Sequence, residues 1–322
     1  MGKGPGKHKR PQLPPVRVPA PEAQGTRGVL ELDRFTEIDL ERWNRLSHEL
    51  DRLHNLLYFG LAGQRGAMRK EILSALQEVD SRPFRFENWV RILPYRFALE
   101  PLSAAGSLTG VGARFNAGRD LPKDVMSPWP ALYLAENFET AFREKYGRPR
   151  DEVSDGLASE ELALQKPESI ASVVVHGNVE RVLDLSDDKA LEPFCAVLRR
   201  CRMPGDVPHI LHQLKIDRKR ISLVRTPAQL RQVVMAPNWR QWPVQFEVPA
   251  HGQILASLLI EAGYEAVLYL SSKSDKRCLA LFPCNLGSAA TFVELTPGYP
   301  KQVKHSRLDL DTASMLDGSA AQ

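Results

Sequence analysis

A stripe of apolar side chains recurs every three or four residues after residue 37, with charged residues between its members. The stripe consists of Trp43, Leu46, Leu50, Leu53 and Leu57. This period matches one face of an α-helix and predicts an amphipathic helix. Glycines between residues 60 and 66 predict a break, and a second helix is expected over 65–79. We therefore predict a helical hairpin over residues 29–82, which either packs on the following domain or pairs two subunits as a homodimer.

Beyond Pro83 the pattern alternates between short β-like runs and helical runs. The expected strands are 170–175, 181–185, 266–270 and 278–282, and the expected helices are 139–146, 191–200, 227–234 and 252–262. This mixture predicts an α+β domain over residues 83–300. The irregular stretch 103–130 is long for a loop in a compact domain, and such loops are often functional. Residues 301–322 are expected to form a polar, loosely held C-terminal tail.

The positive charge of the chain is concentrated at its beginning. Of the formal net charge of +4, residues 1–28 hold about +5, so the remainder is close to neutral. These 28 residues are rich in Pro and Gly and poor in large apolar side chains, which predicts a disordered basic tail. A near-neutral body argues against a nucleic-acid-binding protein, except through this tail.

Features of export and membrane insertion are missing from the sequence. The N-terminus has no apolar run after its positive charges, and no stretch of about 18 apolar residues occurs. The four cysteines form no Cys-x-x-Cys pair, which favours reduced thiols. We expect a cytoplasmic protein without membrane association.

Three separated segments carry residues suited to chemistry. The first combines PYRFA at 94–98 with GARFN at 112–116; the second runs from ALYLA at 131–135 to ETAFRE at 139–144; the third combines GQILA at 252–256 with GYEAVLYLSS at 263–272. Together and in this order they resemble the RES domain family, named for its Arg, Glu and Ser. The resemblance spans residues 84–295.

The resemblance identifies one set of candidate residues. It implies Arg96 with Phe97 as the early pair, although Arg91 competes for that position. The candidates further along are Arg114, Asn116, Tyr133, Glu144 and Ser271, with Ser272 as the alternative to Ser271. This chain departs from the family pattern by having Ala113 in place of a second glycine, and Leu270 in place of a proline before the serine.

The resemblance also implies an activity. RES proteins cleave NAD+ at the nicotinamide–ribose bond, with water or inorganic phosphate as the attacking group, and act as toxins held inactive by an antitoxin, such as an Xre-like protein. Their fold resembles that of ADP-ribosyltransferase toxins. NAD+ is then a substrate, and no cofactor is implied. Two alternatives stay open: an ADP-ribosyltransferase using the same NAD+ site, and a catalytically inactive RES-like binding module.

The residue types suit this chemistry on physical grounds. Arginines such as Arg96 and Arg114 are permanently charged bidentate donors for a pyrophosphate. An aromatic face from Tyr133 or Phe97 suits the nicotinamide ring. A carboxylate stabilises the oxocarbenium-like transition state that forms as the C–N bond breaks, and Glu144 is the candidate. Ser271 is expected to hydrogen-bond ribose or phosphate, because no His–Asp pair is evident to activate it.

Each candidate also has an ordinary structural interpretation. Glu144 could be a solvated helix residue, Tyr133 a core residue, and the two serines turn residues. Three other features are interpreted as non-functional. His209 and His212 lack a third metal ligand, so no metal is assigned; the glycines at 110–112 lack a full dinucleotide-binding pattern; and Trp239, Arg240 and Trp242 are expected to form a packed or lid segment.

Overall fold

The computed structural model describes residues 37–108, 112–119, 121–146 and 170–318. The chain divides into two units, Met1–His48 and Glu49–Gln322. In the first unit, the described residues 37–48 are the beginning of helix α1 (Glu37–Ala67), which continues into the second unit. The predicted basic tail, residues 1–28, lies outside the described residues, as do Gly110 and Val111 of the glycine-containing stretch.

Helix α1 confirms the helix expected from the apolar stripe, but the break expected at 60–66 is wrong. The helix continues through all three glycines, and α2 (Arg69–Gln77) begins only after Met68. Tertiary packing explains why a glycine stands inside the helix at position 60. A Cβ at Gly60 would lie 2.6 Å from Cγ of Pro204, so the glycine allows that close approach. Residues 49–82 therefore belong to the second unit rather than to a separate hairpin.

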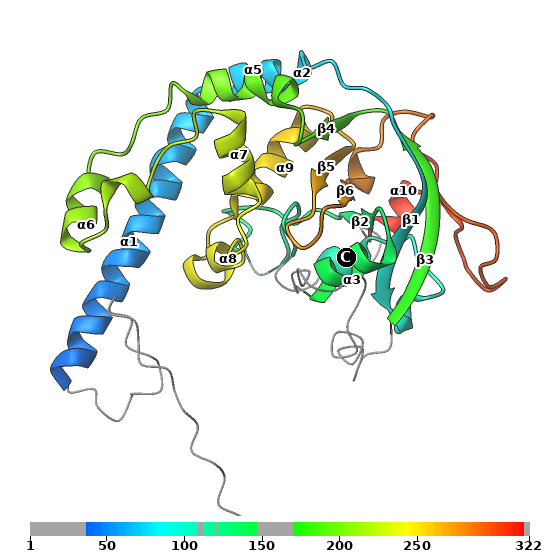
Figure 1. The fold of residues 1–322 in the computed structure, drawn as a ribbon, viewed down its shortest axis with the longest axis horizontal. Coiled ribbons are helices and arrows are strands. Elements are labelled where there is room, and N and C mark those ends of the chain that lie inside the picture. The colour runs from blue at the N-terminus through cyan, green and yellow to red at the C-terminus, as the bar shows by residue number, and fades with distance from the viewer. Residues whose placement is uncertain (1–36, 109–111, 120, 147–169, 319–322) are drawn as a thin grey trace, which may run out of the picture. The chain divides into compact units, whose positions relative to one another are not determined.

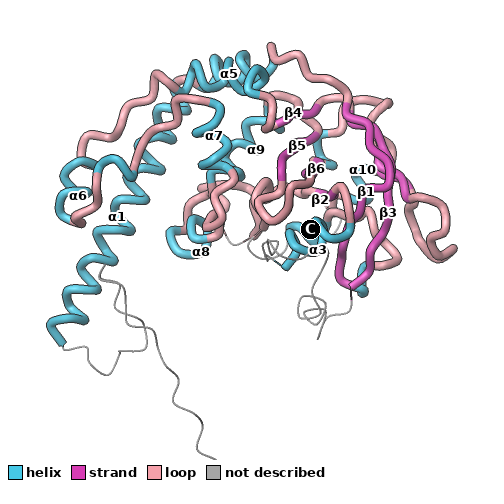
Figure 2. Tube along the Cα trace, in the orientation of Figure 1, coloured by secondary structure: helices cyan, strands magenta, loops and turns pink. Residues whose placement is uncertain are grey.

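The second unit is built on an eight-stranded sheet with the order β4-β5-β6-β2-β1-β3-β7-β8. Neighbouring strands are antiparallel except for the parallel pair β4–β5. The strands are β1 (Phe84–Pro94), β2 (Leu132–Ala135), β3 (Ile170–Val179), β4 (Val182–Asp184), β5 (Ala266–Leu270), β6 (Arg277–Leu281), β7 (Phe292–Leu295) and β8 (Arg307–Leu308). Figure 2 shows six of these strands, from β4 through β5, β6, β2 and β1 to β3, following one another across the unit.

Alternate residues of the central strands face two different apolar clusters. In β5, Val267 and Tyr269 belong to one cluster, whereas Ala266 and Leu268 belong to the other. The same alternation separates Ala280 from its neighbours in β6. Because side chains alternate across a strand, the two clusters lie on opposite faces of the sheet. Both faces are therefore covered in this part of the fold.

Helices pack on the face that holds Tyr269. Helices α2, α5, α7 and α9 contact one another and supply apolar residues to that cluster, beside strands β4 to β6 (Figure 1). Helix α3 packs against β1 and β2. The helices after α2 are α3 (Phe138–Tyr146), α5 (Asp188–Leu198), α6 (Val207–Gln213), α7 (Pro227–Val234), α8 (Gln241–Phe246), α9 (His251–Glu261) and α10 (Ala313–Leu316).

The α+β class expected from the sequence is confirmed, and every strand and helix predicted between 139 and 282 has a counterpart. The C-terminal region differs from the prediction. Residues 301–318 contain β8 and α10, and their side chains Leu308 and Leu316 are 0% and 1% exposed. These two leucines anchor a polar segment to the second apolar cluster, so it is not loosely held. In the part of the chain that the structure describes, no helix combines the length and apolarity that a membrane span requires.

Candidate active site

Arg114 lies in a tight turn formed by residues 113–116. The N–H of Ala113 donates to the carbonyl of Asn116 at 3.1 Å, and the N–H of Asn116 donates back to the carbonyl of Ala113 at 3.3 Å. Gly112, just before the turn, has a φ of 68°, and a Cβ there would lie 2.5 Å from the carbonyl oxygen of Asn116. The turn thus requires the glycine at 112, whereas Ala113 is not among the positive-φ residues of the described chain.

Side chains from β2 and α9 hold this turn in place. The amide of Gln253 donates to the carbonyls of Ala113 at 3.2 Å and Asn116 at 3.1 Å. The hydroxyl of Tyr133 accepts from the N–H of Phe115 at 3.1 Å and donates to Oδ1 of Asn116 at 2.9 Å. Burial raises the pKa of Tyr133, so its hydroxyl stays protonated. The polar atoms of Tyr133 and Asn116 therefore position the turn.

The guanidinium of Arg114 is buried and only partly satisfied by the protein. The Arg114 residue is 7% exposed, and its Nη1 donates to the carbonyls of Val234 at 3.0 Å and Ala236 at 2.8 Å. Its Nε and Nη2 donors have no hydrogen-bond partner among the described residues. Burial lowers the pKa of Arg114, and the nearby carboxylate of Glu144 partly opposes that shift. An arginine remains charged under these conditions, so Arg114 presents two fixed donors to a ligand.

Glu144 and Ser271 meet although 127 positions separate them in the sequence. The Ser271 hydroxyl, at the end of β5, donates to Oε1 of Glu144 on α3 at 2.5 Å. It also accepts from the N–H of Lys273 at 3.0 Å, which fixes its orientation. Ser271 is 8% exposed, whereas Ser272 is exposed to solvent. Of the two alternative serines, the structure brings Ser271 to the carboxylate.

Arg114, Tyr133 and Glu144 line one cavity of about 370 Å³, whereas Ser271 is not among its lining residues and contacts Glu144 by its hydrogen bond. Its charged lining consists of one carboxylate, Glu144, and four basic side chains, which are Arg114, Lys145, Arg240 and Lys273. Its aromatic lining comes from Tyr133, Trp239 and Tyr269. An excess of positive charge in a concave, partly buried site favours an anionic ligand. The cavity therefore suits a phosphate-bearing molecule with an aromatic part.

No family model matches the chain, and no curated protein matches it. Among solved structures, a chain in the crystal structure of the M. tuberculosis MbcT-MbcA toxin-antitoxin complex is similar to it. The two chains share 12% sequence identity, and the likeness covers 76% of this chain and 96% of the other with a TM-score of 0.38. A likeness at that level shows neither the fold nor the function of this chain.

The structure does not bring the early arginines to the cavity. Arg96 and Phe97 are exposed and contact each other, with the guanidinium 4.8 Å from the ring centre. Arg91 donates to the carbonyls of Pro101 at 2.6 Å and Ser103 at 2.8 Å. Burial lowers the pKa of Arg91 to about 10. Its neighbours in β1, Val90 and Ile92, line the cavity instead, because side chains alternate along a strand.

Several lining residues were not among the sequence-based candidates. Lys145, Lys273 and Tyr269 are each next to or near a candidate, yet only the fold shows which way they face. Trp239 and Arg240 form a cation–π pair, with 4.6 Å from guanidinium to ring centre. The sequence predicts that these two residues lie in a packed or lid segment. In the described residues, no cluster of three or more His, Cys, Asp or Glu side chains is placed to hold a metal ion.

Proposed function

We propose that this chain is an NAD+-degrading enzyme that cleaves the nicotinamide–ribose bond, and that it is the toxin of a toxin–antitoxin pair. The observation that carries the proposal is that Glu144, whose carboxylate accepts a hydrogen bond from Ser271, lines the same cavity as Arg114. The ordered motifs that resemble the RES family come from three separate segments, and each segment contributes to this cavity. The toxin role is supported by that resemblance alone.

The charges of the cavity match those of NAD+. The dinucleotide carries two phosphates. The Nε and Nη2 donors of Arg114, which have no partner among the described residues, suit bidentate binding to phosphate oxygens. Arg240 and Lys273 add positive charge to the same lining. The rings of Tyr133 and Trp239 offer apolar faces for the nicotinamide or adenine. Binding would thus neutralise the excess of basic side chains.

The carboxylate of Glu144 supplies the catalytic charge. As the bond between ribose C1 and the nicotinamide nitrogen breaks, its electron pair goes to the nitrogen and positive charge develops on the ribose. A preorganised carboxylate stabilises that charge more in the transition state than in the ground state. Nicotinamide leaves as a neutral molecule. Water then adds to C1 and releases one proton, giving ADP-ribose, or phosphate adds and gives the 1″-phosphate.

Ser271 acts through Glu144 rather than as a nucleophile. The hydroxyl of Ser271 donates its proton to the carboxylate of Glu144, and the hydroxyl oxygen of Ser271 accepts a hydrogen bond from the N–H of Lys273. The hydroxyl thereby fixes the rotamer of Glu144, so that the negative charge is in place before the substrate arrives. Among the described residues, no histidine hydrogen-bonds Ser271 to activate it.

The purified protein, free of any partner, should be incubated with NAD+ with and without phosphate, and the products identified by mass spectrometry. We expect nicotinamide together with ADP-ribose or its 1″-phosphate. Glu144→Gln keeps the hydrogen-bond acceptor for Ser271 but removes the charge, so it should lower turnover by about 100-fold or more while NAD+ binding survives. Expression of the wild type in cells should deplete NAD+ and arrest growth, whereas Glu144→Gln should not.

Glu87→Gln is the matched control, because Glu87 is an exposed carboxylate outside the cavity. It should retain full turnover. Unchanged NAD+ in the wild-type reaction would refute the enzymatic proposal. A mass increase on an added protein or nucleic acid would instead identify an ADP-ribosyltransferase, and turnover without growth arrest would refute the toxin role.

A further inference from the structure

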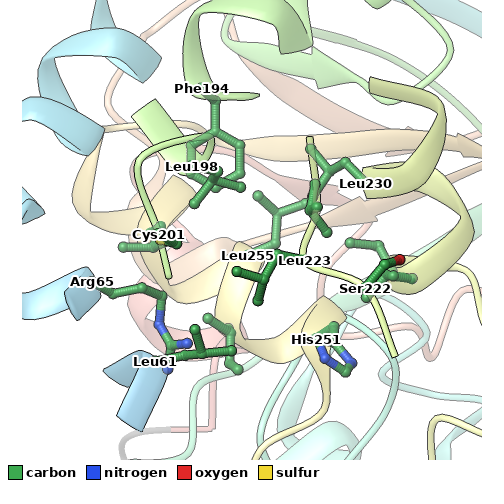
Figure 3. Close-up of a pocket in the computed structure, with 15 residues that line it drawn as sticks. Leu61, Arg65, Phe194, Leu198, Cys201, Ser222, Leu223, Leu230, His251 and Leu255 are labelled. Atoms are coloured by element: carbon green, nitrogen blue, oxygen red, sulfur yellow. The ribbon is translucent and has the colours of Figure 1, made fainter. Parts of the chain in front are cut away.

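A second cavity lies among helices α1, α5, α7 and α9, and it is almost entirely apolar. Its volume is about 160 Å³, and its apolar lining includes Leu61, Phe194, Leu198, Leu223, Leu230 and Leu255. Three polar side chains also line it, namely Arg65, Ser222 and His251. Figure 3 shows Arg65 entering from α1 and His251 from the start of α9, on either side of Leu255 and Leu223.

Arg65 has no acidic partner in the part of the chain that the structure describes. Among the described residues, its guanidinium contacts the ring of Tyr58, at 5.7 Å from the ring centre, and makes no hydrogen bond. Other arginines nearby are paired with carboxylates on the surface, as Arg69 is with Glu261. Burial lowers the pKa of Arg65, and the cationic group nevertheless remains in place. A half-buried charge without a counter-ion is costly, and a bound anion would offset that cost.

His251 is a second polar group without a hydrogen-bond partner among the described residues. Its ring contacts Trp242 edge-on at 4.6 Å between centres. Burial lowers the pKa of His251 to about 4, and the positive charge of Arg65 contributes to this shift. The two groups line the same cavity, and the imidazole is neutral at neutral pH. A neutral imidazole has one N–H that can donate to an anion.

We propose that this cavity binds a small carboxylic acid whose apolar body contains about six to eight carbons. The carboxylate accepts hydrogen bonds from the guanidinium of Arg65 and the ring N–H of His251. The apolar body lies against the leucines and Phe194. The volume agrees with this size, because an apolar cavity of about 150 Å³ admits a molecule as large as benzene. The inference does not depend on NAD+ cleavage.

Binding of octanoate to the full-length protein, measured by calorimetry, tests this inference. The neutral isostere octanamide is the ligand control. We expect octanoate to bind with a Kd below about 1 mM. Octanamide should bind at least about tenfold more weakly, because it lacks the negative charge that strengthens the hydrogen bond with Arg65. Arg65→Gln should weaken octanoate binding by at least about tenfold, whereas Arg52→Gln, on the exposed side of the same helix, should leave it unchanged.

A third variant, Val233→Phe, fills the cavity without touching the charge and should abolish octanoate binding. It keeps the test decisive if Arg65→Gln does not fold, which thermal unfolding will show. Equal binding of octanoate and octanamide would overturn the proposal. So would the absence of octanoate binding up to about 10 mM, or equal affinities of Arg65→Gln and Arg52→Gln.

Discussion

Each cavity contains an arginine, and the two arginines differ in their protein partners. Arg114 donates to two backbone carbonyls and has the carboxylate of Glu144 in the same cavity. Arg65 lines an apolar cavity, and among the described residues its guanidinium contacts the Tyr58 ring and no carboxylate. Burying a charge without partners costs free energy, so the partners of Arg114 offset a cost that stays uncompensated at Arg65. Arg114 is thus both structural and available to a ligand, whereas Arg65 has no acidic partner among the described residues and would gain one from a ligand.

The largest effect should follow from Arg114→Lys, which changes the cavity that contains Glu144 and leaves the apolar cavity unchanged. Lysine cannot reach both carbonyls and a phosphate, because it lacks the planar fork of donors. We expect kcat/KM for NAD+ to fall by about 100-fold, which corresponds to about 2.7 kcal/mol of lost transition-state stabilisation. Steady-state kinetics checks this expectation, and octanoate binding should be unchanged.

Arg85→Lys serves as the control, since Arg85 is exposed on β1 and lines neither cavity. Equal kinetics for the two lysine variants would contradict a role for Arg114. Circular dichroism of both variants distinguishes lost chemistry from a lost fold.

The next effect concerns the start of α9, which lies against the turn at Arg114. A Cβ at Gly252 would lie 2.4 Å from the carbonyl oxygen of Arg114, so Gly252→Ala must push the turn away. We expect a loss of about 1–3 kcal/mol in the free energy of unfolding, measured with urea. Gly63→Ala is the matched control, because no atom lies within 4 Å of a Cβ there and Gly63 is inside α1.

That control should stabilise the protein by about 0.4–1 kcal/mol, because alanine favours a helix interior and restricts the unfolded chain. If Gly252→Ala were as stable as Gly63→Ala, the close approach of α9 to the turn would be refuted.

The smallest effect is a pH dependence that belongs to the apolar cavity. The pKa of His251 is about 4 in the folded protein, below the ordinary value of 6.5 in the unfolded chain. The unfolded chain therefore takes up a proton first as the pH falls, and stability is lost from about pH 6.5 down to about pH 4. The positive charge of Arg65 and the ring of His54 oppose protonation from the neighbouring elements.

Between pH 7.5 and 5.5 the contribution of His251 should amount to about 1 kcal/mol. Urea unfolding of the wild type and of His251→Gln at both pH values measures it as a difference, so other groups cancel. Parallel pH profiles would show that His251 titrates normally and faces solvent.

Local patterns in the sequence predicted much of the fold. The runs at 266–270 and 227–234 coincide with β5 and α7, because their apolar periods are uninterrupted. Strand β1 was not predicted. Its register shifts between Phe86 and Trp89, and Asn88 has a φ of 57°, so the alternation of apolar residues is broken there. An interrupted period of this kind carries no clear strand signal.

The sequence predicted residues of the candidate site only where they lie in recognisable motifs. Arg114, Glu144 and Ser271 come from separate segments; the fold brings Arg114 and Glu144 to one cavity and places Ser271 in hydrogen-bond contact with Glu144. The placement of Arg91 could not be foreseen, because the carbonyls of Pro101 and Ser103 that accept from it belong to an irregular loop. Arg240 enters the cavity from a segment remote from every motif. Such contacts depend on chain topology rather than on local pattern.

Val234 connects the apolar cavity with Arg114 of the other cavity, and this has a kinetic consequence. It lines the apolar cavity, and its carbonyl oxygen accepts a hydrogen bond from Arg114. An occupant of the apolar cavity that displaces the end of α7 would also displace an acceptor of the arginine. Its effect on turnover would then be noncompetitive, because added substrate at Arg114 could not expel a molecule bound on the other side of Val234.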